Sequence, residues 1–255
     1  MAGNRAEGDS RSVAEKLFAI ADAFGAKGGG ELTLSEVAAR ANLPLSTAHR
    51  LLADWIAWGG LVRGDDGLYR VGIRLWKLGV RAPTARRLRM AALPFLEDLY
   101  DVTRQNVHLA IRDGLGALYL ERFSSRGAVP VVSEVGTRLP LHATGVGLVL
   151  LAWSPAEVLA EVLASSPKKF LPNTMTTEAE LAPRLEAIRA RGVAISVNEL
   201  TADSFSAAAP IRDRGGEVIA AVSVIAHADQ ATDPQFPLAV SIAARGISRA
   251  LGWTP

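Results

Sequence analysis

The spacing of apolar residues changes along this chain, and the change limits the folds that are open to it. Between residues 12 and 59, apolar side chains recur about every 3.6 residues, which is the period of a helix with one buried face. From residue 106 onwards, several segments instead show the period of two that is typical of strands. A chain of 255 residues with a helical first third and a mainly stranded remainder is expected to form two domains.

The first third of the chain predicts three helices separated by turn signals, at residues 12–24, 32–43 and 44–59. Ser12 and Glu15 are spaced as a capping box at the start of the first helix. Thr33 or Ser35 can cap the second helix, and Asn42 can adopt the left-handed conformation that ends it. Each predicted helix therefore has its own start or stop signal.

A hairpin is predicted directly after the third helix, because the short strands Leu61–Arg63 and Leu68–Val71 flank an Asp-Gly turn. Helix, helix, tight turn, helix and hairpin is the order of a winged helix-turn-helix. In that fold the third helix enters the major groove of DNA. The expected inward-facing residues of the third helix are Ala48, Leu51, Leu52, Trp55 and Ile56.

Small polar and basic residues on these elements are candidate DNA contacts, because hydroxyl groups and Arg side chains can bind phosphates or base edges. The candidates are Ser35, Ser46, Thr47, His49, Arg50, Arg63 and Arg70. Residues 1–92 hold 14 Lys and Arg against 9 Asp and Glu, a net charge of +5, whereas the rest of the chain has a net charge of −3. A polyanionic partner is therefore expected at the N-terminal part, although a winged helix can also serve only for dimerisation.

A helical segment joins the two parts of the chain. A short helix before Pro83 is followed by a longer one, and Pro94 is expected to kink that helix or to start a new one. We therefore place the DNA-binding domain at residues 1–82, the linker helix at about 83–103 and the second domain at 84–255.

The second domain is predicted to be an antiparallel sheet with helices at its margins, so that the whole chain is of the α+β class. The expected strands are 106–112, 117–123, 129–135, 193–198, 204–211 and 218–225. Residues 141–152 are expected to form a loop that enters a buried helix, and further helices are expected at 154–165, 177–191 and 234–251.

The sequence contains no pattern that predicts catalysis. It has no cysteine, and its four histidines are scattered, which gives no metal site. The Gly-Val-Gly at 145–147 is too short for a dinucleotide-binding fingerprint, and the neighbouring His142 is expected to make a structural hydrogen bond. We therefore expect a sensor without cofactor or metal, and not an enzyme.

Membrane attachment is not expected either. No apolar run reaches the length of a membrane span, and the polar N-terminus lacks the apolar core of a signal peptide. These features predict a cytoplasmic protein.

Four segments together resemble the IclR family of bacterial transcriptional regulators. They are LTLSEVAARANLPLSTAHRLLADW, the hairpin end LYRVG, LPLHATGVGLVLLAW and SAAAPIRDRGGEVIAAVSV. The resemblance extends from about Val13 to Leu251. It implies a winged helix-turn-helix that is joined by a linker helix to a GAF-like effector-binding domain. It also implies homodimers, often paired as dimers of dimers, on palindromic operators, and control of catabolic genes in response to small organic or aromatic acids.

The resemblance further implies an effector pocket between the sheet and the LPLHATGVG segment. The positions carried over are Val131, Leu139, Gly145, Val146, Ser206, Ser223 and Ile225. Ser206 replaces the usual Cys, Ile225 replaces the second Ser of a Ser-x-Ser pattern, and Leu148 replaces the usual Lys. These departures remove a hydroxyl and a cation, which favours a larger or partly aromatic effector unless they only repack the core.

Two alternatives to an effector-responsive DNA-binding regulator stay open. The first is a methyltransferase-like enzyme that uses its winged helix only to dimerise, although the required glycine-rich loop after a parallel strand is absent. The second is a ligand-binding module without DNA affinity, which would require the third helix to be covered in the oligomer.

Overall fold

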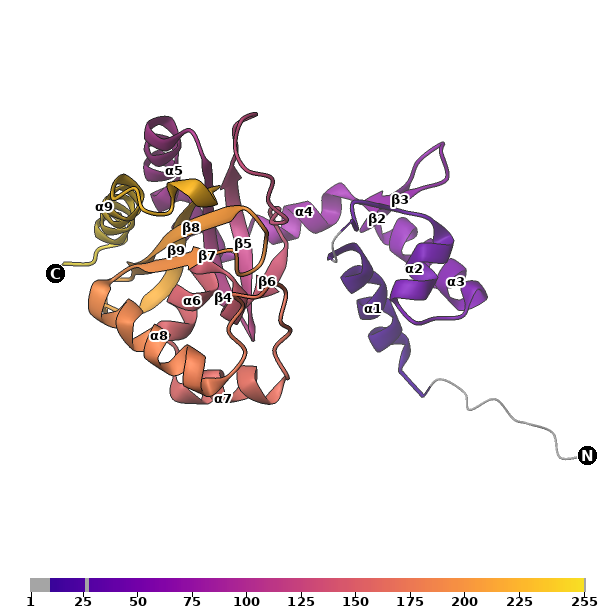
Figure 1. The fold of residues 1–255 in the computed structure, drawn as a ribbon. Helices are drawn as coiled ribbons and strands as arrows, with labels where there is room; N and C mark the ends of the chain where they lie inside the picture. Colours follow the sequence, from indigo (N-terminus) through magenta and orange to yellow (C-terminus); the bar gives the residue numbers. More distant parts are fainter. Residues whose placement is uncertain (1–9, 26–27, 255) are drawn as a thin grey trace, which may run out of the picture. The chain divides into compact units, whose positions relative to one another are not determined.

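The computed structural model describes residues 10–25 and 28–254, and the chain divides into two units, Met1–Pro83 and Thr84–Pro255. Figure 1 shows the elements of both units, each of which is described below on its own. Residues 1–9 of the polar N-terminal segment, which was predicted not to be a signal peptide, lie outside the described residues.

The N-terminal unit combines helices with a small antiparallel sheet. Its helices are α1 (Val13–Gly25), α2 (Leu34–Arg40), α3 (Leu45–Trp58) and α4 (Ile73–Gly79), and its strands are β1 (Glu31–Leu32), β2 (Leu61–Arg63) and β3 (Tyr69–Val71). The strand order is β1-β3-β2, so the predicted hairpin is present and is extended by β1, which the sequence did not predict. This is the arrangement of a winged helix-turn-helix.

The helix starts of this unit follow from local hydrogen bonds. The Glu15 N–H donates to Ser12 Oγ at 3.2 Å, and the Ser12 N–H donates to Glu15 Oε2 at 2.6 Å, which confirms the predicted capping box. At α2 the cap is Thr33 and not Ser35, because Glu36 three residues later completes a second capping box. Ser35 is therefore left on the exposed surface of the first turn.

The first three helices bury one apolar cluster. Its completely buried side chains include Ile20, Val37, Ala48, Leu51 and Leu52. The expectation for Ile56 was wrong, because its side chain is 37% exposed. It lies in the last part of α3, beyond the residues that α3 buries in this cluster. The helix ends at Gly59, which has a φ of 78° and therefore suits glycine.

The linker region forms α4 and then α5 (Pro83–Thr103). The expectation that a new helix starts at Pro94 was wrong, because Pro94 lies inside α5, and the expected kink stays a prediction. Proline removes one backbone hydrogen bond, but α5 is also held by its buried side chains. Leu88, Leu96 and Leu99 of this helix belong to the core of the second unit.

The second unit is built on a six-stranded sheet that confirms the predicted antiparallel α+β domain. Its strands are β4 (Asn106–Asp113), β5 (Gly116–Phe123), β6 (Arg138–Pro140), β7 (Ala194–Val197), β8 (Ser204–Arg212) and β9 (Val218–His227). The order is β6-β5-β4-β9-β8-β7, with every neighbouring pair antiparallel. Besides α5, its helical elements are η1 (Leu141–Ala143), α6 (Gly145–Ala152), α7 (Ala156–Ala164), α8 (Glu178–Arg191), η2 (Ala228–Gln230) and α9 (Gln235–Ala250).

The sheet separates two cores. Helices α5 and α9 cover one face, and α6 with α8 covers the other (Figure 1). Alternation along β8 produces this division, since Phe205 and Ala207 pack toward α9, whereas Ala208 packs toward α6. The faces of the strands are thus set by the period of two in the sequence.

Two local expectations for this unit were wrong. Residues 129–135 form no strand, and the edge of the sheet is β6 instead. Pro130 lacks the N–H that a strand ladder needs, and side chains of the sheet hold this segment in place of a ladder. The helix expected at 154–165 begins at Ala156, with Pro155 and not Ser154 at the cap position.

Candidate functional sites

The candidate DNA contacts of the third helix share one exposed surface. Ser46, His49 and Arg50 are exposed, and Thr47 is half-buried. Their spacings of three and four residues place them along the first two turns of α3. Ser35, in the first turn of α2, is also exposed. We refer to the surface formed by Ser46, Thr47, His49 and Arg50 as the α3 face.

The N-terminus of α3 has no side-chain cap. Its cap position is occupied by Pro44, and no side chain accepts a hydrogen bond from the first turn. Ser46 therefore does not cap the helix. The first backbone N–H groups of a helix carry partial positive charge and bind phosphate groups well when they are open. The α3 face thus combines hydroxyl, imidazole and guanidinium groups with the positive end of a helix.

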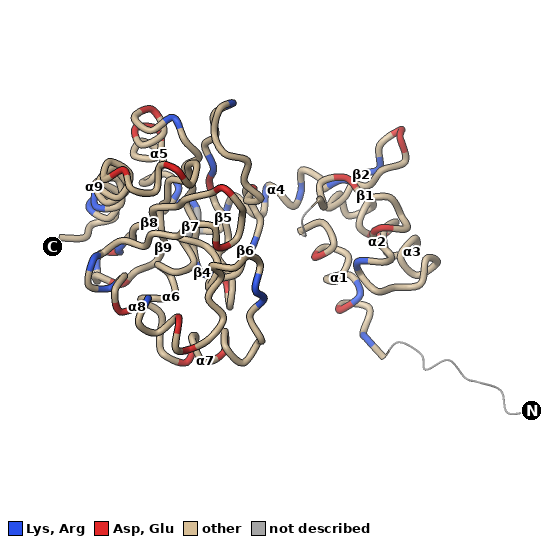
Figure 2. Tube along the Cα trace, viewed as in Figure 1, with Lys and Arg blue, Asp and Glu red and all other residues tan. Residues whose placement is uncertain are grey.

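The two arginines of the hairpin β2–β3 have different surroundings. Arg70 donates hydrogen bonds to Glu31 at 2.8 Å and to Asp66 Oδ1 at 3.0 Å, and it lowers the pKa of Asp66 to about 2. Its charge is therefore compensated inside the unit. Arg63 is exposed and lies over the ring of Tyr69, with 5.5 Å between the guanidinium carbon and the ring centre. Figure 2 shows the acidic tip and the basic strands of this hairpin.

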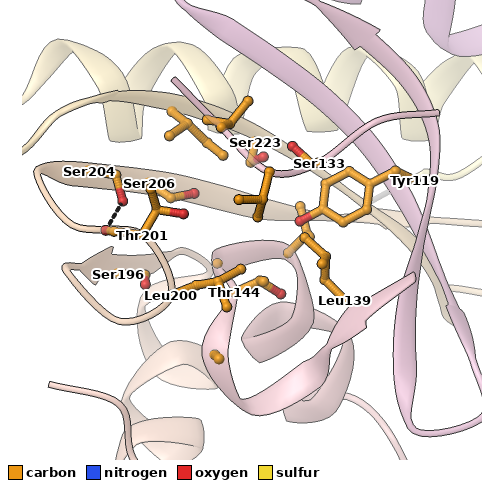
Figure 3. A pocket seen from close by; sticks show the side chains of 16 residues that line it. Tyr119, Ser133, Leu139, Thr144, Ser196, Leu200, Thr201, Ser204, Ser206 and Ser223 are labelled. Atoms are coloured by element: carbon orange, nitrogen blue, oxygen red, sulfur yellow. Dashed lines mark hydrogen bonds between the residues drawn. The ribbon is translucent and has the colours of Figure 1, made fainter. Parts of the chain in front are cut away.

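In the second unit, the seven residues carried over from the family resemblance line one cavity. They are Val131, Leu139, Gly145, Val146, Ser206, Ser223 and Ile225. The cavity has a volume of about 40 Å³ and lies against the sheet face that α6 covers (Figure 3). The positions implied by the family resemblance, which come from four separate segments of the chain, thus line one cavity.

The same cavity contains hydroxyl-bearing residues that the sequence analysis missed. They are Tyr119, Ser133, Thr144, Ser196, Thr201 and Ser204. Thr144 could have been found from the sequence, because a Thr directly before the small residues of a helix is typical of a helix cap. In the structure it caps α6 by accepting the Gly147 N–H at 3.1 Å. Ser133 and Thr201 lie on irregular segments, where no periodicity indicates their direction.

One end of the cavity combines the N-terminus of α6, which Thr144 caps, with an unpaired hydroxyl. Gly145 begins α6 and approaches β8 so closely that an added Cβ atom would lie 2.5 Å from Ser206 Oγ. Ser206 is only 8% exposed, and its Oγ has no hydrogen-bond partner. A buried polar atom without a partner is costly, unless a ligand or water supplies one.

The cavity is suited to binding rather than to acid–base chemistry. None of its sixteen lining residues carries a charge. Tyr119 can titrate, but burial raises its pKa. The groups that a ligand meets in the cavity are hydroxyl groups, apolar side chains and the N-terminus of α6. Together they favour a compact ligand with an anionic end.

Two titratable residues close to the cavity have altered pKa values. Glu199 precedes the lining residue Leu200, and burial raises its pKa to about 7, although Arg184 at 3.6 Å opposes the shift. His108 is completely buried, which lowers its pKa to about 3. His142 makes the predicted structural hydrogen bond, since its Nε2 lies 3.0 Å from the Lys168 carbonyl oxygen.

The described residues contain neither a metal-binding cluster nor a membrane-spanning helix. In that part of the chain, no three His, Asp or Glu side chains are grouped so that they could hold a metal ion. No helix among the same residues is both long and apolar enough to cross a membrane.

Comparisons with known proteins agree with this architecture. The family "Bacterial transcriptional regulator IclR C-terminal" matches residues 81–249, and the "IclR helix-turn-helix domain" matches residues 13–65. Among curated proteins, the HTH-type transcriptional repressor AllR of Klebsiella pneumoniae is 31% identical over 90% of this chain and 86% of its own length. The HTH-type transcriptional regulator XynR of Escherichia coli is 30% identical over 94% of this chain and 96% of its own length.

A solved structure has the same fold over nearly the whole chain. It is an IclR homologue from Microbacterium hydrocarbonoxydans in complex with 4-hydroxybenzoate, and it is 35% identical to this chain. The match covers 94% of this chain and 99% of the other, with a TM-score of 0.87. The relatives named here are regulators, and this disfavours the methyltransferase-like alternative. The chain belongs to the IclR family of bacterial transcriptional regulators, which bind DNA and respond to small-molecule effectors.

Proposed function

We propose that this regulator binds its operator through the α3 face and the hairpin, and that a small organic acid in the cavity changes its operator affinity. The observation that carries the effector part is the meeting of Ser206, which has a buried unpaired hydroxyl, with the first turn of α6, where Thr144 caps the Gly147 N–H. A carboxylate would accept hydrogen bonds from both, and the helix terminus would stabilise its charge.

On the DNA side, His49 and Arg50 are proposed to contact base edges, and Ser46 and Thr47 to contact bases or phosphates. The open N-terminus of α3 supports a phosphate contact beside them. Ser35 and Arg63 are proposed as further backbone contacts, since both are exposed. A direct contact from Arg70 would require it to exchange its hydrogen bonds with Glu31 and Asp66.

On the effector side, an aromatic or other compact acid is supported by two observations. The walls of the cavity include the apolar residues Val131, Leu139, Val146 and Ile225, and the cavity, with a volume of about 40 Å³, would widen to take up an aromatic ring. A relative that is 35% identical was solved with 4-hydroxybenzoate, an aromatic acid. The carboxylate would lie at Gly145 and Ser206, and the body of the effector would contact the apolar walls.

The proposed mechanism is linkage between two sites. An effector that binds one arrangement of the two units better than another shifts the population toward that arrangement, and operator affinity changes in consequence. The same coupling requires operator DNA to change the affinity for the effector by an equal factor.

A homodimer, paired further as a dimer of dimers, is proposed as the binding form. The N-terminal unit exposes large apolar side chains, as an assembling surface would. They include Phe18, Trp58, Ile73, Trp76 and Leu78. Two copies related by a twofold axis would match a palindromic operator. The protein is proposed to act in the cytoplasm, where a bacterial chromosome lies, and to control genes for breakdown of its effector.

The experiment starts from the operator. The wild-type protein selects its binding sequence from random duplex DNA, and the affinity for the selected duplex is measured by fluorescence anisotropy with and without 4-hydroxybenzoate, benzoate and short aliphatic acids. At least one acid is expected to change the affinity, by about fivefold or more for a typical coupling of 1–3 kcal/mol. No selected sequence would contradict the DNA-binding part. A selected operator whose affinity no acid changes would contradict the effector part alone.

A further inference from the structure

The end of the cavity away from Ser206 is covered by residues 124–137, which connect β5 to β6. Side chains of the sheet hold the middle of this cover, whereas Gly136 and Thr137 at its end form backbone hydrogen bonds with Tyr119. Asn106 Nδ2 donates to the Val129 carbonyl oxygen at 2.7 Å, and Arg122 Nη1 donates to the Ser133 carbonyl oxygen at 2.8 Å. Ser133, which lines the cavity, is therefore fixed through its backbone.

The side chain of Ser133 is fixed as well, by a buried histidine. Ser133 Oγ lies 3.1 Å from His108 Nε2, and His108 is completely buried on β4. The imidazole also stands edge-on to the ring of Tyr119, with centres 5.2 Å apart and an interplanar angle of 89°. His108 itself is not among the lining residues, so it would act on a ligand only through Ser133.

The surroundings of His108 indicate which nitrogen carries its proton. Burial, with a further contribution from the charge of Arg122, keeps the imidazole neutral at neutral pH, so that only one nitrogen is protonated. Nδ1 has no hydrogen-bond partner. A proton on Nδ1 would leave a buried N–H unpaired, which is rarer in proteins than an unpaired acceptor. The proton is therefore assigned to Nε2, which donates it to Ser133 Oγ.

This assignment determines what Ser133 can do in the cavity. Because its oxygen accepts the hydrogen bond from His108, its own O–H is free to donate to a ligand. We propose that His108 is a positioning residue, which holds the Ser133 hydroxyl as a donor for a second polar group of the effector, remote from the carboxylate. The inference rests on the proposed effector function and adds to it a class of ligand, a compact acid with an oxygen acceptor at its far end.

The separation of the two polar ends follows from the sheet order. Ser206 lies on β8 and His108 on β4, with β9 between them. Two strand spacings amount to about 10 Å, and the offset of two residues along the strands increases the separation to about 12 Å, because Ser223 pairs with His108 and with Ala208. Figure 3 shows Ser206 and Ser204 on one side of the cavity and Ser133 beside Tyr119 on the other. An effector with one polar group would leave one of these ends unsatisfied.

The test compares 4-hydroxybenzoate with benzoate, which lacks only the oxygen remote from the carboxylate. Isothermal titration calorimetry of the wild-type protein is expected to give about tenfold tighter binding of 4-hydroxybenzoate, the value of about 1.4 kcal/mol for one hydrogen bond to a ligand. Ser133→Ala is expected to reduce this ratio to about one while benzoate still binds. Equal binding of the two acids to the wild type, or an unchanged ratio in Ser133→Ala, would overturn the inference.

Two substitutions of His108 separate positioning from packing. His108→Gln retains an N–H near the place of Nε2, whereas His108→Asn has a shorter side chain that loses this donor. Both replace a buried ring by an amide, so their effects on stability are comparable. The preference for 4-hydroxybenzoate is expected to survive in His108→Gln and to be lost in His108→Asn. Loss in both variants, or survival in both, would contradict the positioning role.

A measurement without any ligand keeps the inference separate from the proposed function. The ¹⁵N chemical shifts of the His108 imidazole, measured by NMR at pH 7, distinguish a proton on Nε2 from one on Nδ1. A proton on Nε2 is expected, and a proton on Nδ1 would overturn the inference. If neither acid bound the wild type, 4-hydroxybenzoate and benzoate would be excluded as effectors, while the imidazole shifts would still decide which nitrogen of His108 donates to Ser133.

Discussion

Gly145, at the start of α6, and Ser206, on β8, approach each other so closely that a methyl group at Gly145 would lie 2.5 Å from the serine hydroxyl. No side chain fits between this helix terminus and the sheet. The absence of a side chain at Gly145 therefore leaves the Ser206 hydroxyl, beside the first turn of the helix, open to a ligand. Gly145 therefore forms part of the cavity wall, and a substitution of this glycine should change ligand binding.

Gly145→Ala is expected to weaken effector binding by about tenfold or more, because the methyl group fills the end of the cavity that is proposed for the carboxylate. The effects on stability oppose each other, since Ala favours a helix by about 0.5–1 kcal/mol over Gly while the contact with Ser206 is repulsive. Calorimetric titration with the acid that the operator experiment identifies measures the change. Gly127→Ala is the matched control, because a methyl group there meets no atom within 4 Å. Equal affinity of the two variants would contradict the proposed position of the carboxylate.

Arg50→Ala is expected to weaken binding to the selected operator and to lower the slope of log affinity against log salt by about one, the change for one lost phosphate contact. If Arg50 reads a base instead, the loss is about 1–3 kcal/mol and appears as relaxed specificity at one position of the operator. Arg214→Ala is the control, because Arg214 is an exposed arginine in the turn between β8 and β9. Anisotropy titrations at several salt concentrations measure both variants. Unchanged operator affinity and slope in Arg50→Ala would remove Arg50 from the proposed contacts.

The sequence predicted those parts of the fold in which one local signal decides the outcome. Ser12 with Glu15 set the start of α1, and the alternation around Ser206 and Ser223 set the faces of β8 and β9. The cavity positions were found through family resemblance and not through periodicity, because residues as far apart as Leu139 and Ser223 meet only after the sheet has formed.

The remaining features depend on tertiary structure. Residues 129–135 have a strand-like composition, yet hydrogen bonds from Asn106 and Arg122 hold them as a cover over the cavity. Strand β1 is two residues long and exists only because β3 pairs with it. The sequence alone does not show why Ser206 in place of the usual Cys matters. The structure gives the reason, because the Ser206 hydroxyl is buried and has no hydrogen-bond partner.

The stability of the second unit is expected to depend on pH through Glu199. Burial raises its pKa from 4.5 to about 7, so between these values the folded state binds more protons than the unfolded state. The free energy of unfolding therefore falls as the pH rises through this range, by up to about 3 kcal/mol. His108 has the opposite sign, because its pKa is lowered to about 3; its contribution to the free energy of unfolding rises up to pH 6.5 and offsets part of the Glu199 effect below that pH.

Glu199→Gln isolates this contribution. Urea unfolding at pH 5 and pH 8, followed by hydrogen exchange in peptides from β8 and β9, reports on the second unit alone. Between pH 5 and pH 8, the free energy of unfolding of the wild type is expected to change less favourably than that of Glu199→Gln, in which the rise due to His108 is no longer offset by Glu199. Glu186→Gln, at an exposed position of α8, is the control and should follow the wild type. Parallel pH profiles of Glu199→Gln and the wild type would contradict the assignment.

The last prediction concerns the attachment of the hairpin to the end of α3. The Gly72 N–H donates to the Gly60 carbonyl oxygen at 2.7 Å, and a Cβ atom at Gly72 would lie 2.5 Å from the carbonyl oxygen of Gly59. Both neighbours are backbone, which cannot rotate away as a side chain can, so Gly72→Ala forces the hairpin and the end of α3 apart. A typical cost for such overpacking is about 1–3 kcal/mol.

Gly72→Ala is therefore expected to reduce hydrogen-exchange protection in β2 and β3 and to lower operator affinity, because the hairpin that carries Arg63 is displaced. Acid binding to the cavity is expected to persist, since every lining residue belongs to the other unit. Gly79→Ala, in α4 of the same unit, is the matched control, because an added methyl group there meets no atom within 4 Å. Wild-type protection of the hairpin in Gly72→Ala would show that this close contact does not hold β2 and β3 in place. Loss of acid binding would show instead that the cavity depends on the N-terminal unit.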